Sequence, residues 1–144
     1  MRRNYALIAL AAVLLASGSA PAGEQGALVS WEALAQVSVT RQKDRYVPEF
    51  SKQIVALDKR AVRLRGFMLP LEQGARQKHF LLSAQPPECA FCMPGSAEQF
   101  AEVRTRTPVK YVSEPITLSG TFMLVRDESG GLLYRLHEAT LVDK

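Results

Sequence analysis

The sequence predicts a mostly β protein: a small barrel of the oligonucleotide/oligosaccharide-binding (OB) type, with about six strands and one short N-terminal helix. Apolar and polar residues alternate in several short segments, which is the period of a strand. Turn-forming residues separate these segments, and strands do not alternate with helices. Gly66 and Gly120 stand inside two longer segments, where a strand of a closed barrel can bend. A small sandwich is the alternative, because periodicity does not distinguish the two.

A single short helix is predicted over residues 30–37. Trp31 and Leu34 have the spacing of one helical face. Ser30 is suited to the N-cap, and Glu32 lies in the first turn, where a negative charge favours the helix dipole.

The remaining elements are predicted to be strands. Residues 38–45 are polar and Pro48 interrupts the segment after them, so no regular element is predicted there. Residues 54–57 and 62–67 are expected to form a hairpin around the turn pair Asp58-Lys59. Further strands are predicted over residues 79–83, 100–107, 116–125 and 132–142.

The first 22 residues have the pattern of an export signal. Arg2 and Arg3 precede an unbroken run of eleven apolar residues, which ends at Ala16, and small residues follow as far as Ala22. A membrane-spanning helix needs about 20 apolar residues. The pattern therefore predicts a signal peptide over residues 1–22 rather than an anchor. The mature chain, residues 23–144, is expected to be one periplasmic domain that does not span a membrane.

The charge balance argues against a nucleic-acid partner. The chain of 144 residues carries a formal charge of +4, and two of its arginines lie in the predicted signal peptide. An exported protein also meets little nucleic acid. Five basic residues fall on alternate positions of predicted strands, so one sheet face could dock an anionic ligand or an acidic protein, or simply face solvent: Arg63, Arg65, Arg104, Arg106 and Lys110.

The motif Cys89-Ala90-Phe91-Cys92 is the strongest chemical signal. Two thiols at this spacing can close a disulfide, bind a soft metal or exchange disulfides. An exported protein meets an oxidising compartment, which favours a structural disulfide. Pro94-Gly95 follows after Met93 and argues against the helix that a thioredoxin-type centre needs. The disulfide and metal interpretations therefore both stay open.

A metal site would need ligands besides the two cysteines, because zinc takes about four. His79 precedes the cysteine loop on the adjacent predicted strand, whereas His137 lies in the last strand. We therefore predict a site formed by Cys89, Cys92 and His79, which suits zinc or, with a thioether nearby, copper(I). No hydrolase constellation accompanies the serines, so no catalytic activity is expected.

Four segments together resemble one known family, the domain-of-unknown-function family 3299 of small exported proteins from Gram-negative bacteria. They are Leu57-Asp58-Lys59-Arg60-Ala61-Val62, Gly66-Phe67-Met68-Leu69-Pro70-Leu71, His79-Phe80-Leu81-Leu82 and Pro87-Glu88-Cys89-Ala90-Phe91-Cys92-Met93-Pro94-Gly95. On the family pattern, His79, Cys89 and Cys92 match recurrent polar positions. The family hairpin usually reads Leu-Asp-Gly-Lys, and here Lys59-Arg60 replaces the glycine step. Some members are encoded beside permease components linked to metal supply, so the resemblance implies a transport setting.

These observations predict a soluble periplasmic accessory of an envelope transport or metal-homeostasis system. It would bind a soft or borderline metal, zinc or copper, through Cys89, Cys92 and His79. Its partner would be an envelope transporter or another periplasmic protein. Two alternatives remain: a non-catalytic interaction or scaffold module with a structural Cys89–Cys92 disulfide, and a thiol–disulfide partner of an envelope oxidoreductase.

Overall fold

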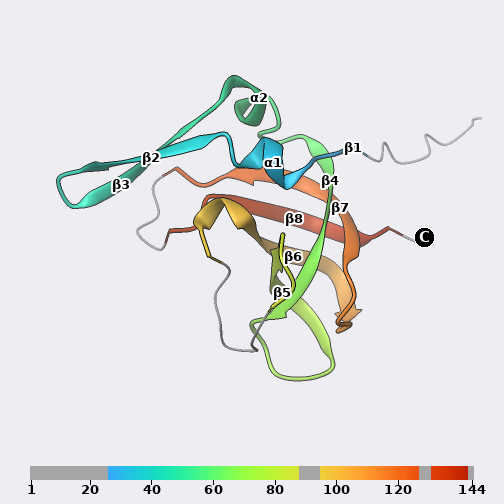
Figure 1. Cartoon of the computed structure of the whole chain (residues 1–144). Coiled ribbons are helices and arrows are strands. Elements are labelled where there is room, and N and C mark those ends of the chain that lie inside the picture. The colour runs from blue at the N-terminus through green and yellow to red at the C-terminus, as the bar shows by residue number, and fades with distance from the viewer. Residues whose placement is uncertain (1–25, 88–94, 127–130, 143–144) are drawn as a thin grey trace, which may run out of the picture.

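The computed structural model describes residues 26–87, 95–126 and 131–142 (Figure 1). Its elements, in chain order, are β1 (Ala27–Leu28), α1 (Trp31–Leu34), β2 (Val37–Gln42), β3 (Arg45–Phe50), α2 (Lys52–Val55), β4 (Ala61–Pro70), β5 (Arg76–Ser83), the short 3-10 helix η1 (Ala97–Gln99), β6 (Phe100–Lys110), β7 (Ile116–Leu124) and β8 (Tyr134–Leu141).

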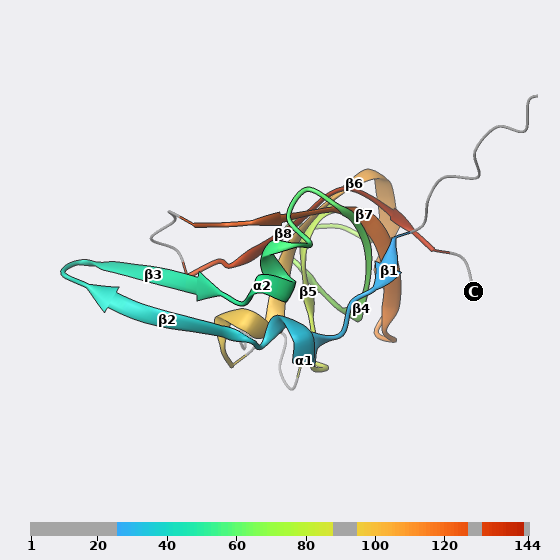
Figure 2. The same cartoon turned by 90° about the horizontal axis from the view of Figure 1, so that it is seen from above.

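Five strands close into a barrel in the order β4-β5-β6-β8-β7, and β7 pairs back with β4. The β6–β8 pair is parallel, and the other pairs within the ring are antiparallel. This order is that of the OB-type Greek-key barrel. Figure 2 shows the strands arranged around a ring, and β1 adds a short parallel strand to the edge of β4. The prediction of a small, mostly β barrel is confirmed.

Glycine permits the close approach of strands at both expected bends. β4 pairs with β7 as far as Gly66 and with β5 from Phe67 onward. A Cβ at residue 66 would lie 2.5 Å from the carbonyl oxygen of Ser83. Gly120 lies where the register between β7 and β8 shifts, and a Cβ there would lie 2.8 Å from the carbonyl oxygen of His137. Only glycine fits either position without a shift of the backbone.

The barrel interior is filled by large side chains, and the two short helices close one end. Leu34 of α1 and Ile54 of α2 are fully buried. The Tyr134 hydroxyl donates a hydrogen bond to the Leu34 carbonyl oxygen at 2.5 Å. Each fully buried apolar side chain contributes about 1.5–3 kcal/mol. The barrel core includes Val62, Leu64, Met68, Phe80, Leu82, Ala101, Val103, Leu118, Phe122, Tyr134, Leu136 and Ala139.

The predicted helix and five of the six predicted strands are present, with different ends. Ser30 caps α1 as expected, because its hydroxyl accepts a hydrogen bond from the Ala33 amide, but the helix ends at Leu34. The strand predicted over residues 54–57 is wrong. Ser51 caps helix α2 there, so Ile54 faces the core on a helical turn rather than on a strand.

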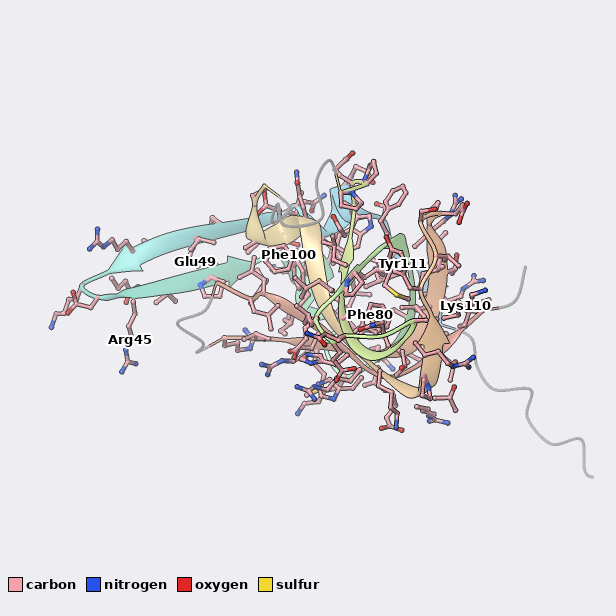
Figure 3. The ribbon with its side chains drawn as sticks, turned by 90° about the horizontal axis from the view of Figure 1, so that it is seen from below. Arg45, Glu49, Phe80, Phe100, Lys110 and Tyr111 are labelled. Atoms are coloured by element: carbon pink, nitrogen blue, oxygen red, sulfur yellow. The ribbon has the colours of Figure 1, made fainter. Side chains whose placement is uncertain are left out.

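The hairpin β2–β3 was not predicted. Its twelve residues form a separate two-stranded sheet, in which Pro48 pairs with Val39. Proline is tolerated there because both strands are sheet edges. Figures 1 and 2 show this hairpin extending away from the barrel, and Figure 3 shows Arg45 and Glu49 along it. We call it the arm.

Within the part of the chain that the structure describes, no helix is long and apolar enough to cross a membrane.

Candidate functional site

His79 lies on the outside of the barrel, in β5. It pairs with Arg104 of β6, next to an irregularity in the strand register that follows Gln77. Its side chain is 27% exposed. Cys89 and Cys92 lie outside the described residues, so the predicted three-residue site can be assessed only at His79.

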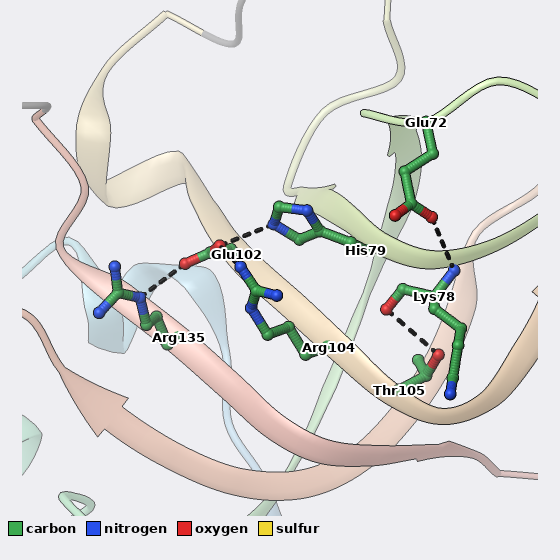
Figure 4. A network of polar contacts seen from close by, with 7 residues as sticks. All are labelled: Glu72, Lys78, His79, Glu102, Arg104, Thr105 and Arg135. Carbon is green, nitrogen blue, oxygen red and sulfur yellow. Dashed lines mark hydrogen bonds and ion pairs between the residues drawn. The ribbon is translucent and has the colours of Figure 1, made fainter.

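The Glu102 carboxylate is the centre of a polar network on the outer face of β5, β6 and β8 (Figure 4). One oxygen, Oε1, lies 2.7 Å from His79 Nε2 and 3.3 Å from an Arg104 guanidinium nitrogen. The other, Oε2, accepts a hydrogen bond of 2.6 Å from Arg135 Nε. The Glu102 side chain is only 12% exposed. Side chains from three strands thus converge on one largely covered carboxylate.

The network keeps Glu102 ionised. Partial burial raises the pKa of Glu102, but the hydrogen bonds from Arg135 and His79 and the charges of Arg135 and Arg104 outweigh that effect. The pKa of Glu102 therefore lies below its ordinary value. An ionised carboxylate only accepts hydrogen bonds.

The charge of Glu102 determines which nitrogen of His79 can bind a metal. Because the carboxylate only accepts, His79 Nε2 must carry the hydrogen of the 2.7 Å bond. In the neutral ring the lone pair then lies on Nδ1. No hydrogen bond from the rest of the described chain occupies Nδ1. Metal-binding histidines characteristically donate their other N–H to a carboxylate in this way.

The two cysteines belong to the segment that joins β5 to β6. The strand from His79 to Ser83 is about 13 Å long, and the cysteine loop leaves β5 at Ser83. The chain bends there, because the Ala84 amide donates to the Gln99 carbonyl oxygen at 2.8 Å, and Cys89 follows two residues after Pro87, the last described residue before it. The loop returns to the barrel at β6, the strand that carries Glu102.

The described residues alone do not form a metal centre. No group of three or more histidine, cysteine, aspartate or glutamate side chains with suitable geometry occurs in residues 26–87, 95–126 and 131–142. His137 lies on β8 opposite Thr121 of β7, and no other described residue forms a hydrogen bond or ion pair with its ring. A site at His79 therefore depends on the two cysteines.

Sequence reasoning missed Glu102 and Arg135. The alternation of apolar and polar residues along β6 places Glu102 on the outer face of the barrel. It does not reveal the partners of Glu102, which belong to β5 and β8. Arg135 is 33 residues away in sequence, and only the parallel β6–β8 pairing brings it near.

The predicted row of basic residues is split in two by the fold. Arg63 and Arg65 lie where β4 pairs with β7, and the Arg63 guanidinium donates to the Gly26 carbonyl oxygen at 2.9 Å. Arg104, Arg106 and Lys110 lie along β6, beside β5. The row is therefore not one face.

Fold and site together define a small OB-type barrel protein with a histidine–carboxylate–arginine network on its outer face. The chain belongs to the family of proteins of unknown function DUF3299, whose family model matches residues 19–141. It is similar to the crystal structure of a DUF3299 family protein from Pseudomonas aeruginosa PAO1, with 25% sequence identity and a TM-score of 0.52. That similarity covers 67% of this chain and 68% of the other. No curated protein matches the sequence.

Proposed function

We propose that this protein is a non-catalytic metal-binding accessory of an envelope transport or metal-homeostasis system. His79 Nδ1 would bind zinc or copper(I) together with the thiolates of Cys89 and Cys92. The observation that supports it best is the 2.7 Å bond between His79 Nε2 and ionised Glu102, which directs the free lone pair to Nδ1.

Two thiolates and one imidazole suit a metal that is passed on. Zinc takes these ligands readily, and copper(I) prefers thiolate. Three protein ligands leave a fourth position for water or for a ligand from a partner. That open position favours delivery, because a recipient can enter the coordination shell before the metal leaves.

Metal titration of the reduced protein tests the proposal. Zinc, or copper(I) in competition with a chelator, should bind at one equivalent and release protons, because the thiols ionise on binding. Cys89→Ser should abolish binding. His79→Ala should weaken it by about 10-fold or more, and Glu102→Gln by about 10-fold, since Glu102 orients the ring.

His137→Ala is the matched control, because it removes a half-exposed histidine from β8, a strand that β6 separates from β5. It should leave the affinity unchanged. Equal losses in the His79 and His137 variants would contradict a site at His79.

The arm favours a second candidate, a non-catalytic interaction module with a structural Cys89–Cys92 disulfide. Val37 and Phe50 at the base of this hairpin pack against the core, and the part that extends beyond them offers surface to another protein. Protein taken from cells without free thiols or metal, with a Cys89→Ser variant that only loses stability, would support this candidate. Rapid exchange with an envelope oxidoreductase would instead support the thiol–disulfide partner.

A further inference from the structure

The outer side of the β5–β6 pair carries a band of positive charge. We call it the basic stripe and define it by five residues: Arg76, Lys78, Arg104, Arg106 and Lys110. All five are exposed, and their neighbours Gln77, Thr105 and Val109 point into the barrel. From Arg104 to Lys110 the stripe extends about 20 Å along β6.

Carboxylates neutralise only part of the stripe. Within the described chain, Arg106 pairs with Glu138 at 3.1 Å, and Arg104 shares Glu102 with Arg135 and His79. Glu72 accepts a hydrogen bond from the backbone amide of Lys78. No ion pair within the described residues reaches Arg76, Lys78 or Lys110.

The register places like charges opposite one another. Arg76 of β5 pairs directly with Lys110 of β6, and like charges at such positions destabilise a sheet. The Arg76 guanidinium donates a hydrogen bond to the carbonyl oxygen of Pro108 in β6 at 3.0 Å. Both side chains are exposed, so packing of the core does not require a positive charge at residue 76 or residue 110. A bound anion would convert this repulsion into attraction at both residues.

In OB-type barrels, the second and third strands of the ring form the face that binds oligonucleotides and oligosaccharides. β5 and β6 are those strands in this barrel. The aromatic side chains on them, Phe80 and Phe100 (Figure 3), are buried. The next exposed ring, Tyr111, lies beyond the end of β6. The stripe therefore lacks the series of exposed rings on which successive bases stack.

We infer that the basic stripe binds an acidic oligosaccharide, a sugar chain that carries carboxylate, sulfate or phosphate groups. The five cations follow the line of the strands and so match a linear polyanion. The ligand would lie along β6 beside the Glu102 network. This binding does not depend on a metal at His79.

Binding of defined polyanions to the purified protein tests the inference. The probes are heparin, which carries sulfate and carboxylate, polygalacturonate, which carries carboxylate alone, and oligo-dT. Heparin or polygalacturonate should bind with an affinity that falls steeply with salt. The variant Lys78→Gln/Arg106→Gln/Lys110→Gln should lose about 10-fold or more in affinity and should show a shallower salt dependence.

The matched control is Lys43→Gln/Arg45→Gln/Lys52→Gln, which removes three exposed charges from the arm and α2. Its affinity should stay within about two-fold of the parent protein. Equal losses in the two triple variants would overturn the inference, because binding would then follow net charge. Tighter binding of oligo-dT than of both saccharides at equal salt would also overturn it.

Thermal melting of Lys110→Gln gives a readout that does not depend on a ligand. The melting temperature should stay the same or rise, because the variant removes the like-charge pair with Arg76. A lower melting temperature would show that Lys110 serves the fold, and would contradict its assignment to a binding face.

Discussion

Gly66 of β4 lies against the carbonyl oxygen of Ser83 in β5, so closely that a Cβ at residue 66 would sit 2.5 Å from that oxygen. At this point β4 leaves β7 and pairs with β5. The contact is with backbone, which cannot swing aside as a flexible side chain would. Barrel closure therefore depends on the absence of a side chain here.

Replacing either glycine at a bend with valine should destabilise the barrel. We expect Gly66→Val and Gly120→Val each to lower the free energy of unfolding by about 1–3 kcal/mol, because strand backbones must separate. Thermal melts measure the effect. Thr117→Val, an unburied position on β7, should change stability by no more than about 0.5 kcal/mol. Unchanged melting of both glycine variants would rule out a steric role.

Tyr134→Phe should destabilise the junction between the barrel and α1. Leu34 ends α1, and its carbonyl oxygen loses its hydrogen bond from the Tyr134 hydroxyl. An unsatisfied buried carbonyl costs about 1–3 kcal/mol. Denaturant unfolding at pH 7 should show this loss.

The buried hydroxyl of Tyr134 should also make the protein less stable at alkaline pH. Burial, and secondarily the charge of Glu98, raises the pKa of Tyr134. Because the pKa of Tyr134 is higher in the folded than in the unfolded protein, the unfolded chain loses the phenol proton first as the pH rises. The free energy of unfolding therefore begins to fall once the pH passes the unfolded pKa, near 10. The advantage of the parent protein over Tyr134→Phe should therefore persist to about pH 10 and change only above it. A difference that varies between pH 6 and 9 would contradict this assignment.

Lys59→Gly should stabilise the turn before β4. Lys59 has a φ of 61°, in the left-handed region that favours glycine. The strain that glycine relieves is larger than the entropic cost of fixing glycine on folding. The free energy of unfolding should therefore rise by about 0.5 kcal/mol. Lys59→Ala keeps the strain and should give no gain. Chemical denaturation of both variants separates conformational strain from loss of the lysine charge.

Glu102→Gln should remove a contribution to stability that is present at neutral pH and lost in acid. The pKa of Glu102 is lowered in the folded protein, so its contribution is present above the unfolded pKa, near 4.3, and is lost as the pH falls through the folded value. We expect the variant to be less stable by about 1 kcal/mol at pH 7. The difference should shrink below about pH 4.

Glu138→Gln is the control for this pH dependence. Its ion pair with Arg106 is exposed, with the Glu138 side chain 70% accessible, so the change should be within about 0.5 kcal/mol at any pH. Equal behaviour of the two variants would show that the Glu102 network has no special role.

Several features could be predicted from the sequence because they depend on local patterns. Alternation assigned β6, β7 and β8 and the faces their residues take. Gly66 and Gly120 marked the bends, because a glycine inside a strand signals close backbone approach. Ser30 marked the start of α1 through its side-chain hydrogen bond. Local pattern misled at residues 54–57, where a short apolar run fits a strand or a helical turn equally well. It also missed the hairpin β2–β3, whose polar residues and Pro48 argued against a regular element.

The sequence by itself thus determined a mostly β chain with bends at two glycines, a capped first helix and a pair of cysteines at residues 89 and 92. Only the tertiary structure decided which strands are neighbours: that β7 closes on β4, that β2 and β3 form an arm, and that His79, Glu102 and Arg135 meet. The reason is physical. A side chain's face follows from the residues next to it, whereas its partners follow from pairing between strands far apart in the chain.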